Sequence, residues 1–198
     1  MEFKKNFKNT ETAKNLAHAY TNETRLAAKY KEYAAVAKFE GYKLIEEMLE
    51  EFAENESDHA EIFQSFLLLY CPEEDINISF DIPIRFTNDT MQNLRDVIKL
   101  EDEEAIKLYP EFAKQALADG YKAVADAFNN IAAIEKRHSH VDSKLLAHLE
   151  NGTLYSCKES VEWKCHECGH LHKGTEPPIS CPVCTHSQGM FEIYIENF

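Results

Sequence analysis

Four long apolar stripes run through residues 1–151, and acidic or imidazole side chains interrupt each one near its middle. Apolar residues recur at alternating steps of three and four around residues 16–34, 45–66, 94–112 and 124–149. This spacing is typical of an α-helix that buries one face. The sequence therefore predicts four amphipathic helices. The residues that interrupt their buried faces are Glu23, Glu56, His59, Glu101, Glu104, Glu135 and His138.

The breaks between these segments predict how the helices are connected. Gly41 is compatible with a turn between the first two helices, and Gly120 with a turn between the last two. Residues 71–89 contain two prolines and are too numerous for a tight turn. A connection of that length lets the third helix run parallel to the second, as in four-helix bundles with one long crossover. One of residues 88–90, all of capping type, is expected to begin the third helix.

The interrupting residues repeat in the two halves of the helical region. A Glu-x-x-His motif ends each half, at residues 56–59 and 135–138, and a glutamate on the preceding stripe lies at nearly the same distance before it. A spacing of three places both side chains on one helix face. One such motif usually marks a solvated face in an acidic helical chain, but the repeat makes coincidence a poor explanation. Seven candidate ligands are thus expected at one level of the bundle.

Buried glutamates on this scale need neutralisation. If all of them were ionised, each would cost several kcal/mol of desolvation in a low-dielectric core. They must therefore be protonated or compensated, and two divalent or two trivalent cations bracket the charge of the five carboxylates. Oxygen-rich ligands with one imidazole per metal suit iron or manganese better than a metal that prefers soft ligands, and iron supports redox chemistry. The pattern predicts a binuclear metal site.

A second group of candidate ligands lies after residue 152, where the composition changes to Cys, Pro, His and Gly. Cys165 and Cys168 form one Cys-x-x-Cys pair, and Cys181 and Cys184 form another. In a reducing compartment such pairs bind metal more often than they form disulfides. A segment of about 40 residues also needs a staple to fold, which four thiolates on one metal supply. The ligands admit either zinc, in a structural ribbon, or a single iron.

Charge and hydropathy exclude several classes of function. The chain has 198 residues with 21 Lys plus Arg against 35 Asp plus Glu, a formal net charge of −14. Such a surface repels polyanions, so we expect no nucleic-acid partner and no acidic membrane surface. No apolar run approaches the roughly 18 residues of a membrane span, and the N-terminal residues lack the apolar region of a signal peptide. These features favour a cytoplasmic protein.

The two ligand groups together resemble the rubrerythrin family over nearly the whole chain. The glutamate at position 104 is the feature that distinguishes this family from ordinary ferritins. The resemblance implies a mainly α fold, with a ferritin-like four-helix bundle and one long crossover over residues 1–152. A small β-rich rubredoxin-like domain with one iron bound by four cysteines follows over residues 153–198. The motifs that carry the resemblance are Glu23, Glu56-Ser-Asp-His59, Glu101-Asp-Glu-Glu104, Glu135-Lys-Arg-His138 and the run from Trp163-Lys-Cys165-His-Glu-Cys168-Gly169 to Cys181-Pro182-Val-Cys184.

The resemblance also implies a role for each ligand of a binuclear non-haem iron site. Glu56 and Glu135 are implied to bridge the two metals, with Glu23 and Glu101 as terminal carboxylates. His138 is implied to bind the second metal. All seven helix residues, including His59 and Glu104, are thereby candidate catalytic residues as well as metal ligands.

A ligand exchange is part of the same resemblance. The first iron is implied to exchange its bond to Glu104 for one to His59 on reduction, since a ferric ion favours an anionic oxygen and a ferrous ion accepts a neutral imidazole. Tyr30 and Tyr109 are implied to hydrogen-bond the site, although core packing explains them equally well. Thr185 departs from the pattern, because free rubredoxins usually have glycine after the fourth cysteine.

The activity implied by the resemblance is that of a peroxidase in oxidative stress defence. The di-iron centre reduces hydrogen peroxide to water, and the thiolate-bound iron returns electrons to it. An NAD(P)H-linked flavoprotein or a small redox carrier is the implied external donor. Residues 138–150 carry the chain about 18 Å from the site at 1.5 Å per residue. Because electron tunnelling decays with distance, we expect a homodimer in which one chain's small domain docks near the partner's di-iron site.

Two other functions are compatible with the same residues. The bundle alone could serve as a ferroxidase or iron-handling protein that oxidises ferrous iron with oxygen. Alternatively, a bundle with a structural zinc ribbon could be a non-enzymatic interaction module. Visible absorption with metal analysis separates the last alternative from the others, because ferric tetrathiolate is red and zinc is colourless.

Overall fold

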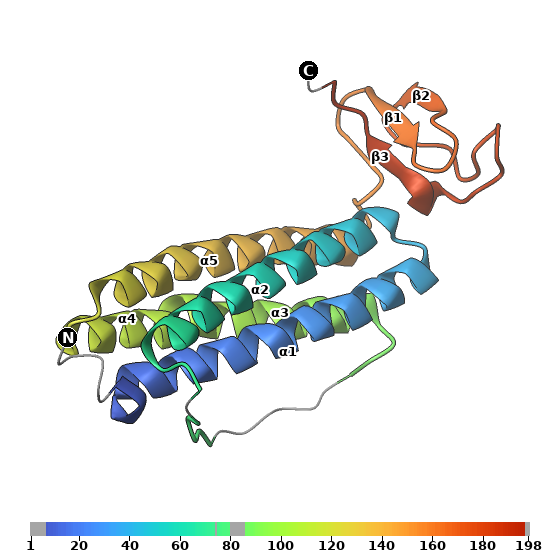
Figure 1. The fold of residues 1–198 in the computed structure, drawn as a ribbon. Helices are drawn as coiled ribbons and strands as arrows, with labels where there is room; N and C mark the ends of the chain where they lie inside the picture. The colour runs from blue at the N-terminus through green and yellow to red at the C-terminus, as the bar shows by residue number, and fades with distance from the viewer. Residues whose placement is uncertain (1–6, 74, 80–85, 197–198) are drawn as a thin grey trace.

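The computed structural model describes residues 7–73, 75–79 and 86–196. The fold is mainly helical with a small C-terminal sheet, which confirms the predicted class (Figure 1). Part of the predicted crossover, residues 74 and 80–85, lies outside the described residues. In order, the elements are α1 (Glu11–Glu40), α2 (Lys43–Tyr70), α3 (Thr90–Glu103), the π turn η2 (Glu104–Leu108), α4 (Tyr109–Ala118), α5 (Lys122–Glu150), β1 (Val161–Cys165), β2 (Leu171–Gly174), the 3₁₀ turn η3 (Gln188–Met190) and β3 (Phe191–Ile193).

The helices pack as two pairs, α1 with α2 and α3–α4 with α5. The backbone N–H of Thr90 donates to Glu40 Oε2 at 3.1 Å, which places the start of α3 beside the end of α1. At the opposite end of the bundle, the Thr12 hydroxyl donates to Asp119 Oδ2 at 2.6 Å. Between α2 and α3 the chain therefore crosses back to the end of the bundle where α1 ends and α2 begins, which confirms the single crossover.

Local sequence signals account for the helix ends. Asp89 caps α3, and its carboxylate accepts a hydrogen bond from the backbone N–H of Gln92 at 2.7 Å. Gly41 ends α1 with a left-handed φ of 84°, and Gly120 has a φ of 86° between α4 and α5. Glycine adopts this conformation without a Cβ clash, so both turns form where the sequence predicts them.

The third predicted helix is confirmed, but it contains a π turn. The apolar spacing predicts one helix over residues 94–112, but the π turn η2 divides it into α3 and α4. Pro110 has no N–H to offer the carbonyl of Ile106, which weakens the α-helical bonding of this turn. The N–H of Tyr109 instead reaches the carbonyl of Glu104, five residues earlier. The wider turn begins at a candidate ligand, as π turns often do at functional sites.

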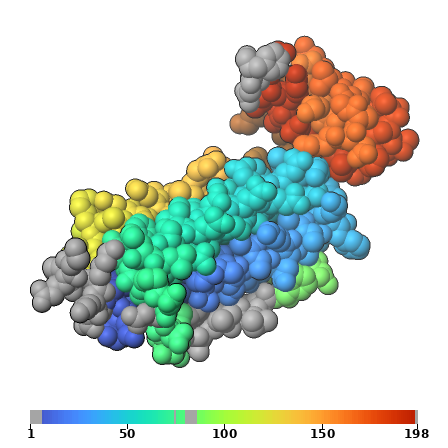
Figure 2. All heavy atoms as spheres, viewed as in Figure 1, coloured from blue at the N-terminus to red at the C-terminus, as the bar shows by residue number. Residues whose placement is uncertain are grey.

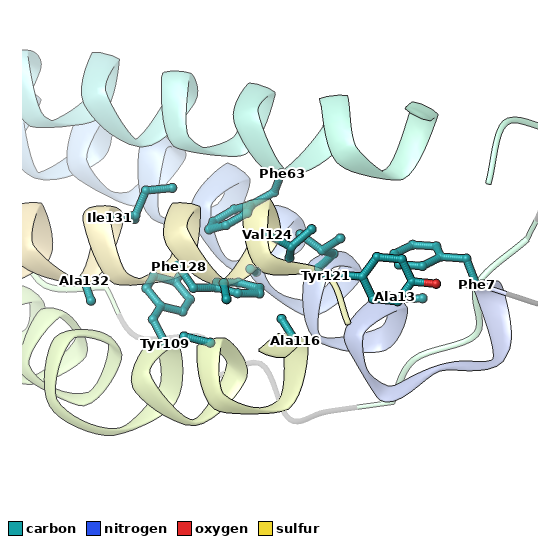
Figure 3. Packing of buried hydrophobic residues seen from close by; sticks show 14 of the residues in the cluster. Phe7, Ala13, Phe63, Tyr109, Ala116, Tyr121, Val124, Phe128, Ile131 and Ala132 are labelled. Carbon is teal, nitrogen blue, oxygen red and sulfur yellow. The ribbon is translucent and has the colours of Figure 1, made fainter. Parts of the chain in front are cut away.

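Two apolar clusters fill the bundle on either side of one polar level. One includes Phe63, Tyr109, Phe128 and Ile131, and Figure 3 shows these side chains directed toward one another from α2, α4 and α5. The other cluster is built around Phe52 and further apolar residues of α1, α2, α3 and α5. Along each helix the candidate ligands lie between the residues of these two clusters, so the fold itself places the ligand level in a dry core.

The C-terminal segment folds as a three-stranded antiparallel sheet in the order β2-β1-β3. Trp163 and Phe191 are buried beside Cys165 and Cys181 in its small core. The indole N–H of Trp163 donates to the carbonyl of Gly174 at 3.1 Å. None of the helices in the described part of the chain has both the length and the apolarity that a membrane span requires.

The small sheet contacts the bundle at the turn between α1 and α2. Figure 2 shows the C-terminal lobe resting against one end of the helices. Gly189 approaches this turn so closely that a Cβ added there would lie 1.7 Å from the carbonyl oxygen of Gly41. His166 Nδ1 lies 3.3 Å from Glu47 Oε1 on α2. The contact therefore depends on a glycine at position 189.

Gly189→Ala is expected to loosen this contact, because the added methyl group overlaps the backbone of Gly41 and over-packing typically costs about 1–3 kcal/mol. Limited proteolysis should then cut residues 151–160 faster than in the parent protein. Gln188→Ala is the control, because the side-chain amide of Gln188 donates within the small domain, to the carbonyl of Pro177 at 2.9 Å. Equal cutting rates for all three proteins would contradict the contact.

Candidate metal centres

All seven candidate ligands of the helical region are buried and come from four sides of the bundle. None exposes more than 3% of its surface. A buried set of this kind cannot be a solvated acidic face. By element, α1 supplies Glu23, α2 supplies Glu56 and His59, α3 supplies Glu101, η2 supplies Glu104, and α5 supplies Glu135 and His138.

Six of the seven residues form two sets of donor atoms, and in each set the atoms lie within 4.8 Å of one another. The two sets share two carboxylates, which is the arrangement that a pair of metals with bridging ligands requires. Glu104 belongs to neither set. The sets are Glu23, Glu56, His59 and Glu135, and Glu56, Glu101, Glu135 and His138.

The two shared carboxylates each turn one oxygen toward each histidine. Glu56 Oε2 lies 3.1 Å from His59 Nδ1, and Glu56 Oε1 lies 2.9 Å from His138 Nδ1. Glu135 Oε1 lies 2.9 Å from His59 Nδ1, and Glu135 Oε2 lies 3.0 Å from His138 Nδ1. Each imidazole thus presents the same nitrogen to the same pair of carboxylates, which gives the two donor sets an approximate two-fold relation.

Many of these donor atoms have no hydrogen-bond partner in the part of the chain that the structure describes. They include Glu23 Oε2, Glu101 Oε2, Glu104 Oε2 and His138 Nε2. A buried acceptor without a partner costs about 1–3 kcal/mol. Buried carboxylate oxygens and imidazole nitrogens that converge in this way are the environment of a metal ion. The donor set fits two iron ions, since it is oxygen-rich with one imidazole for each.

The pKa values of the carboxylates diverge inside this cluster. Burial raises the pKa of Glu23 well above its ordinary value, and the neighbouring carboxylates raise it further. Burial and the same neighbours act in the same direction on the pKa of Glu101 and of Glu104. Burial alone would also raise the pKa of Glu56, but His138 and His59 beside it outweigh burial and lower the pKa to about 2.

Both histidines hold protons strongly when no metal replaces them. Burial acts to lower the pKa of His59, but the carboxylates of Glu135 and Glu56 outweigh it and raise the pKa to about 10. The same two carboxylates raise the pKa of His138 to about 9 against the effect of burial. Metal ions must therefore displace protons from this cluster, so metal binding is coupled to pH.

Two buried tyrosines fix the terminal carboxylates. The Tyr109 hydroxyl donates to Glu23 Oε1, and the Tyr30 hydroxyl donates to Glu101 Oε1 at 2.6 Å. Both rings are also fully buried and belong to the two apolar clusters. Hydrogen bonding to the site and core packing, the two roles the sequence leaves open, therefore coexist in each tyrosine.

Asp142 is a site residue that the sequence analysis misses. Its Oδ2 lies 3.1 Å from the Tyr30 hydroxyl oxygen, and its Oδ1 is buried without a partner among the described residues. The Tyr30 hydroxyl is thus within donating distance of two carboxylates, Glu101 and Asp142, and has one proton to share between them. Burial raises the pKa of Asp142 to about 7. The available signal is spacing, since Asp142 follows His138 by one helical turn on the same stripe.

Asn22 and Arg25 also escape the sequence analysis. The Asn22 amide nitrogen donates to Glu104 Oε1, and Arg25 Nη2 donates to Asn22 Oδ1 at 2.6 Å. Glu104 is thus held by a side chain of α1, while His59 lies inside the first donor set. No motif marks Asn22 or Arg25, because both lie beside the buried stripe of α1 and not on it.

The four cysteines form the third donor set, within 4.8 Å of one another. The Sγ atoms of Cys165 and Cys184 are 3.7 Å apart, and those of Cys168 and Cys181 are 3.6 Å apart. Metal–sulfur bonds of about 2.3 Å give tetrahedral edges of about 3.8 Å. Burial acts to raise the pKa of Cys181, but backbone N–H groups outweigh it and lower the pKa to about 6. The set suits one tetrahedral metal ion.

Thr185 preserves the turn geometry that the sequence left in doubt. Its φ is 64°, and Gly169 has a φ of 74° at the equivalent place in the first knuckle. The Thr185 N–H donates to the carbonyl of Cys181, and the Gly169 N–H to that of Cys165, both at 2.9 Å. A β-branched residue is strained in this left-handed conformation. The second knuckle therefore keeps its shape at a cost in stability.

The fold and its donor sets define a ferritin-like di-metal carboxylate protein that carries a thiolate metal domain. The family model "Rubrerythrin" matches residues 14–146 and 92–162, and the model "Rubrerythrin, rubredoxin-like domain" matches residues 163–192. Rubrerythrin-1 of Clostridium acetobutylicum is 40% identical over 98% of this chain and 100% of its own. Rubrerythrin of Clostridium perfringens is 36% identical over the same shares. The chain belongs to the rubrerythrin family, a family of oxidoreductases.

Solved structures support the fold independently. Nigerythrin in a mixed-valent state aligns with a TM-score of 0.63 at 24% identity, over 92% of this chain and 86% of its own. Symerythrin from Cyanophora paradoxa, reduced with dithionite, aligns with a TM-score of 0.62 at 23% identity, over 71% of this chain and 86% of its own. The cofactors are a binuclear non-haem iron centre in the bundle and one mononuclear iron in the four-cysteine site.

The metal-free protein is expected to lose stability as the pH rises. The raised pKa of Glu23 and Glu101 means that the folded state keeps protons that the unfolded state releases above the ordinary pKa of 4.5. His59 and His138 act in the same direction, from the ordinary value of 6.5 up to about 10 and about 9. Their stabilisation is therefore complete below these ordinary values and is lost as the pH climbs.

Thermal unfolding of the metal-free protein should accordingly give a lower melting temperature near pH 9 than near pH 5. With iron bound, the melting temperature should instead increase as the pH rises from acidic values, because the ligands must be deprotonated to bind iron. A metal-free melting temperature that increases over this range is the contrary result.

Thr185→Gly is expected to stabilise the C-terminal metal domain by about 0.5–1 kcal/mol. Relief of a left-handed φ gains about 1–2 kcal/mol, and the added freedom of glycine in the unfolded chain offsets about 0.4–1 kcal/mol. Denaturant unfolding of the iron-loaded protein, followed by its visible thiolate absorption, measures the change. Gly169→Ala, at a φ of 74°, should lower the stability. Equal midpoints for all three proteins would show that neither knuckle is strained.

Proposed function

We propose that this protein is a non-haem di-iron peroxidase that reduces hydrogen peroxide to water in oxidative stress defence. The observation that carries the proposal is the pair of buried donor sets that share Glu56 and Glu135, on the same chain as a four-thiolate site. The family membership adds a class of oxidoreductases to that geometry. The division of the chain at residues 152 and 153 and the assignment of eleven site residues belong to the same proposal. So does a reducing compartment, the cytoplasm, which keeps the thiolates available.

The chain's residues hold the metals in a dry and rigid setting. When bound, two ferrous ions supply the two electrons that, with two protons, convert one peroxide into two waters. Glu56 and Glu135 would bind both ions, and the hydroxyl groups of Tyr109 and Tyr30 hold the outer carboxylates in place. The apolar clusters on either side exclude bulk water, which strengthens the electrostatic interactions within the site.

Asp142 is the side chain best placed to supply a proton. When protonated at Oδ2, Asp142 would donate to the Tyr30 hydroxyl oxygen 3.1 Å away, and Tyr30 donates in turn to Glu101 Oε1. A shift of both hydrogens along this line would deliver a proton to a ligand carboxylate without admitting water. A general acid with a pKa near 7 is well matched to proton transfer at neutral pH.

A groove gives small molecules an approach to the ligand level. Its volume is about 400 Å³, and it follows the seam between α1 and α2. Ala27 and Ala60 are among the residues that line it, and they lie one helical turn after Glu23 and Glu56 on the same helices. Hydrogen peroxide is small enough to pass where larger oxidants are excluded.

Electrons are proposed to come from the C-terminal iron of a second copy. The small domain lies at the end of the bundle where α2 begins at Lys43, and Glu56 follows 13 residues later, about 20 Å along the helix. Such a separation disfavours transfer within one chain, which supports the proposed homodimer. An NAD(P)H-linked flavoprotein or a small redox carrier would reduce the thiolate-bound iron.

Cys168→Ser is expected to lower NAD(P)H-driven peroxide reduction at least about 100-fold, because it removes a thiolate from the relay. The substitution should leave a single turnover of the chemically prereduced bundle unchanged. Peroxide consumption, NAD(P)H oxidation and visible absorption are measured on the same full-length protein. Cys157→Ser is the matched control, because Cys157 is not among the four converging thiolates. If Cys168→Ser leaves the rate of NAD(P)H-driven peroxide reduction unchanged, the proposal is wrong. If the protein only oxidises ferrous iron with oxygen, the bundle works as a ferroxidase and the proposal is likewise wrong.

A further inference from the structure

Glu104 is the one candidate ligand that an uncharged side chain holds outside the donor sets. It comes from the π turn η2, is buried, and accepts a hydrogen bond at Oε1 from the Asn22 amide nitrogen of α1. Its Oε2 has no hydrogen-bond partner among the residues described. Asn22 itself exposes only 8% of its surface. The Asn22 amide therefore fixes the position of the Glu104 carboxylate outside the two donor sets.

Arg25 determines which way the Asn22 amide points. A guanidinium can only donate hydrogen bonds, and Arg25 Nη2 lies 2.6 Å from Asn22 Oδ1. With its oxygen occupied by Arg25, the amide can offer only its nitrogen to Glu104. If the amide were flipped, its N–H groups would face the N–H groups of Arg25. Arg25, Asn22 and Glu104 therefore have only one consistent hydrogen-bonding arrangement. Arg25 lies three residues after Asn22 on α1, so both side chains are on the same helix face.

His59, unlike Glu104, has a ring nitrogen inside one of the two donor sets. Its Nδ1 belongs to the donor set that includes Glu23, the residue next to Asn22 in the chain. The structure therefore combines an imidazole inside the set with a carboxylate held away from it. Whatever holds Glu104 away favours the imidazole, since the two side chains are alternative ligands.

We propose that Asn22, oriented by Arg25, is a positioning residue that holds Glu104 away from the metals and so stabilises the form with His59 as ligand. This inference rests on the ligand exchange of the proposed function. A ferrous ion accepts a neutral imidazole, whereas a ferric ion favours an anionic oxygen. The Asn22 amide thus stabilises the reduced form and makes the di-iron centre easier to reduce.

The test is the midpoint potential of the di-iron centre in the full-length iron-loaded protein with Asn22→Ala. Loss of the amide should shift the exchange toward Glu104 by about tenfold, which lowers a one-electron midpoint potential by about 59 mV. The mixed-valent electron paramagnetic resonance signal reports this potential. The four-cysteine iron of the same molecule is an internal reference that should not change. A purely structural role for Asn22 would alter the melting temperature and leave the potential unchanged.

Thr21→Ala is the matched control, because the Thr21 hydroxyl donates only to the carbonyl of Ala17 on its own helix, at 2.8 Å. An unchanged or higher di-iron potential in Asn22→Ala, with two irons bound, would overturn the inference. If Asn22→Ala does not fold, Arg25→Met tests the same claim by releasing the amide's orientation. It should lower the potential, with Arg25→Lys closer to the parent protein. These titrations contain no peroxide and no NAD(P)H. Their outcome therefore does not depend on whether the protein is a peroxidase.

Discussion

Burial of five carboxylates in one layer of a helical bundle is the constraint on which the rest of the structure depends. Ionised and uncompensated, these groups would together cost more than the net stability of a typical domain, about 5–15 kcal/mol, since each carries a desolvation penalty of several kcal/mol. Protons or cations must share the layer with them. The raised pKa of Glu23 and of both histidines shows that protons fill this role when metal is absent. Metal binding and folding are therefore linked through the same groups.

The surroundings of this layer serve the same constraint. Apolar clusters on both sides keep the layer dry, and hydroxyl groups of buried tyrosines orient the outer carboxylates. The Asn22 amide donates to Glu104, and Asp142 lies within hydrogen-bond distance of the Tyr30 hydroxyl. The carboxylate layer is thereby surrounded almost entirely by uncharged side chains.

Helical periodicity made most of the bundle and its ligand level predictable from sequence. The interruption of a stripe by Glu-x-x-His is visible without a structure, because i and i+3 share a helix face whatever the tertiary fold. The π turn at Glu104 was not predictable from that spacing, because the spacing of apolar residues does not distinguish a π turn from an α turn. Asn22 lay off the stripe, and Gly189 acts through its contact with a distant backbone. Such features depend on how helices meet, which a single sequence does not encode locally.

The central claim is that two irons occupy the carboxylate layer and one iron the four cysteines. Anomalous X-ray diffraction at the iron absorption edge, from crystals of the full-length protein grown with iron, tests it most directly. We expect two peaks between Glu56 and Glu135 and a third among the four thiolates. An empty layer with its glutamates turned toward solvent, or zinc as the only metal at these positions, would contradict the account.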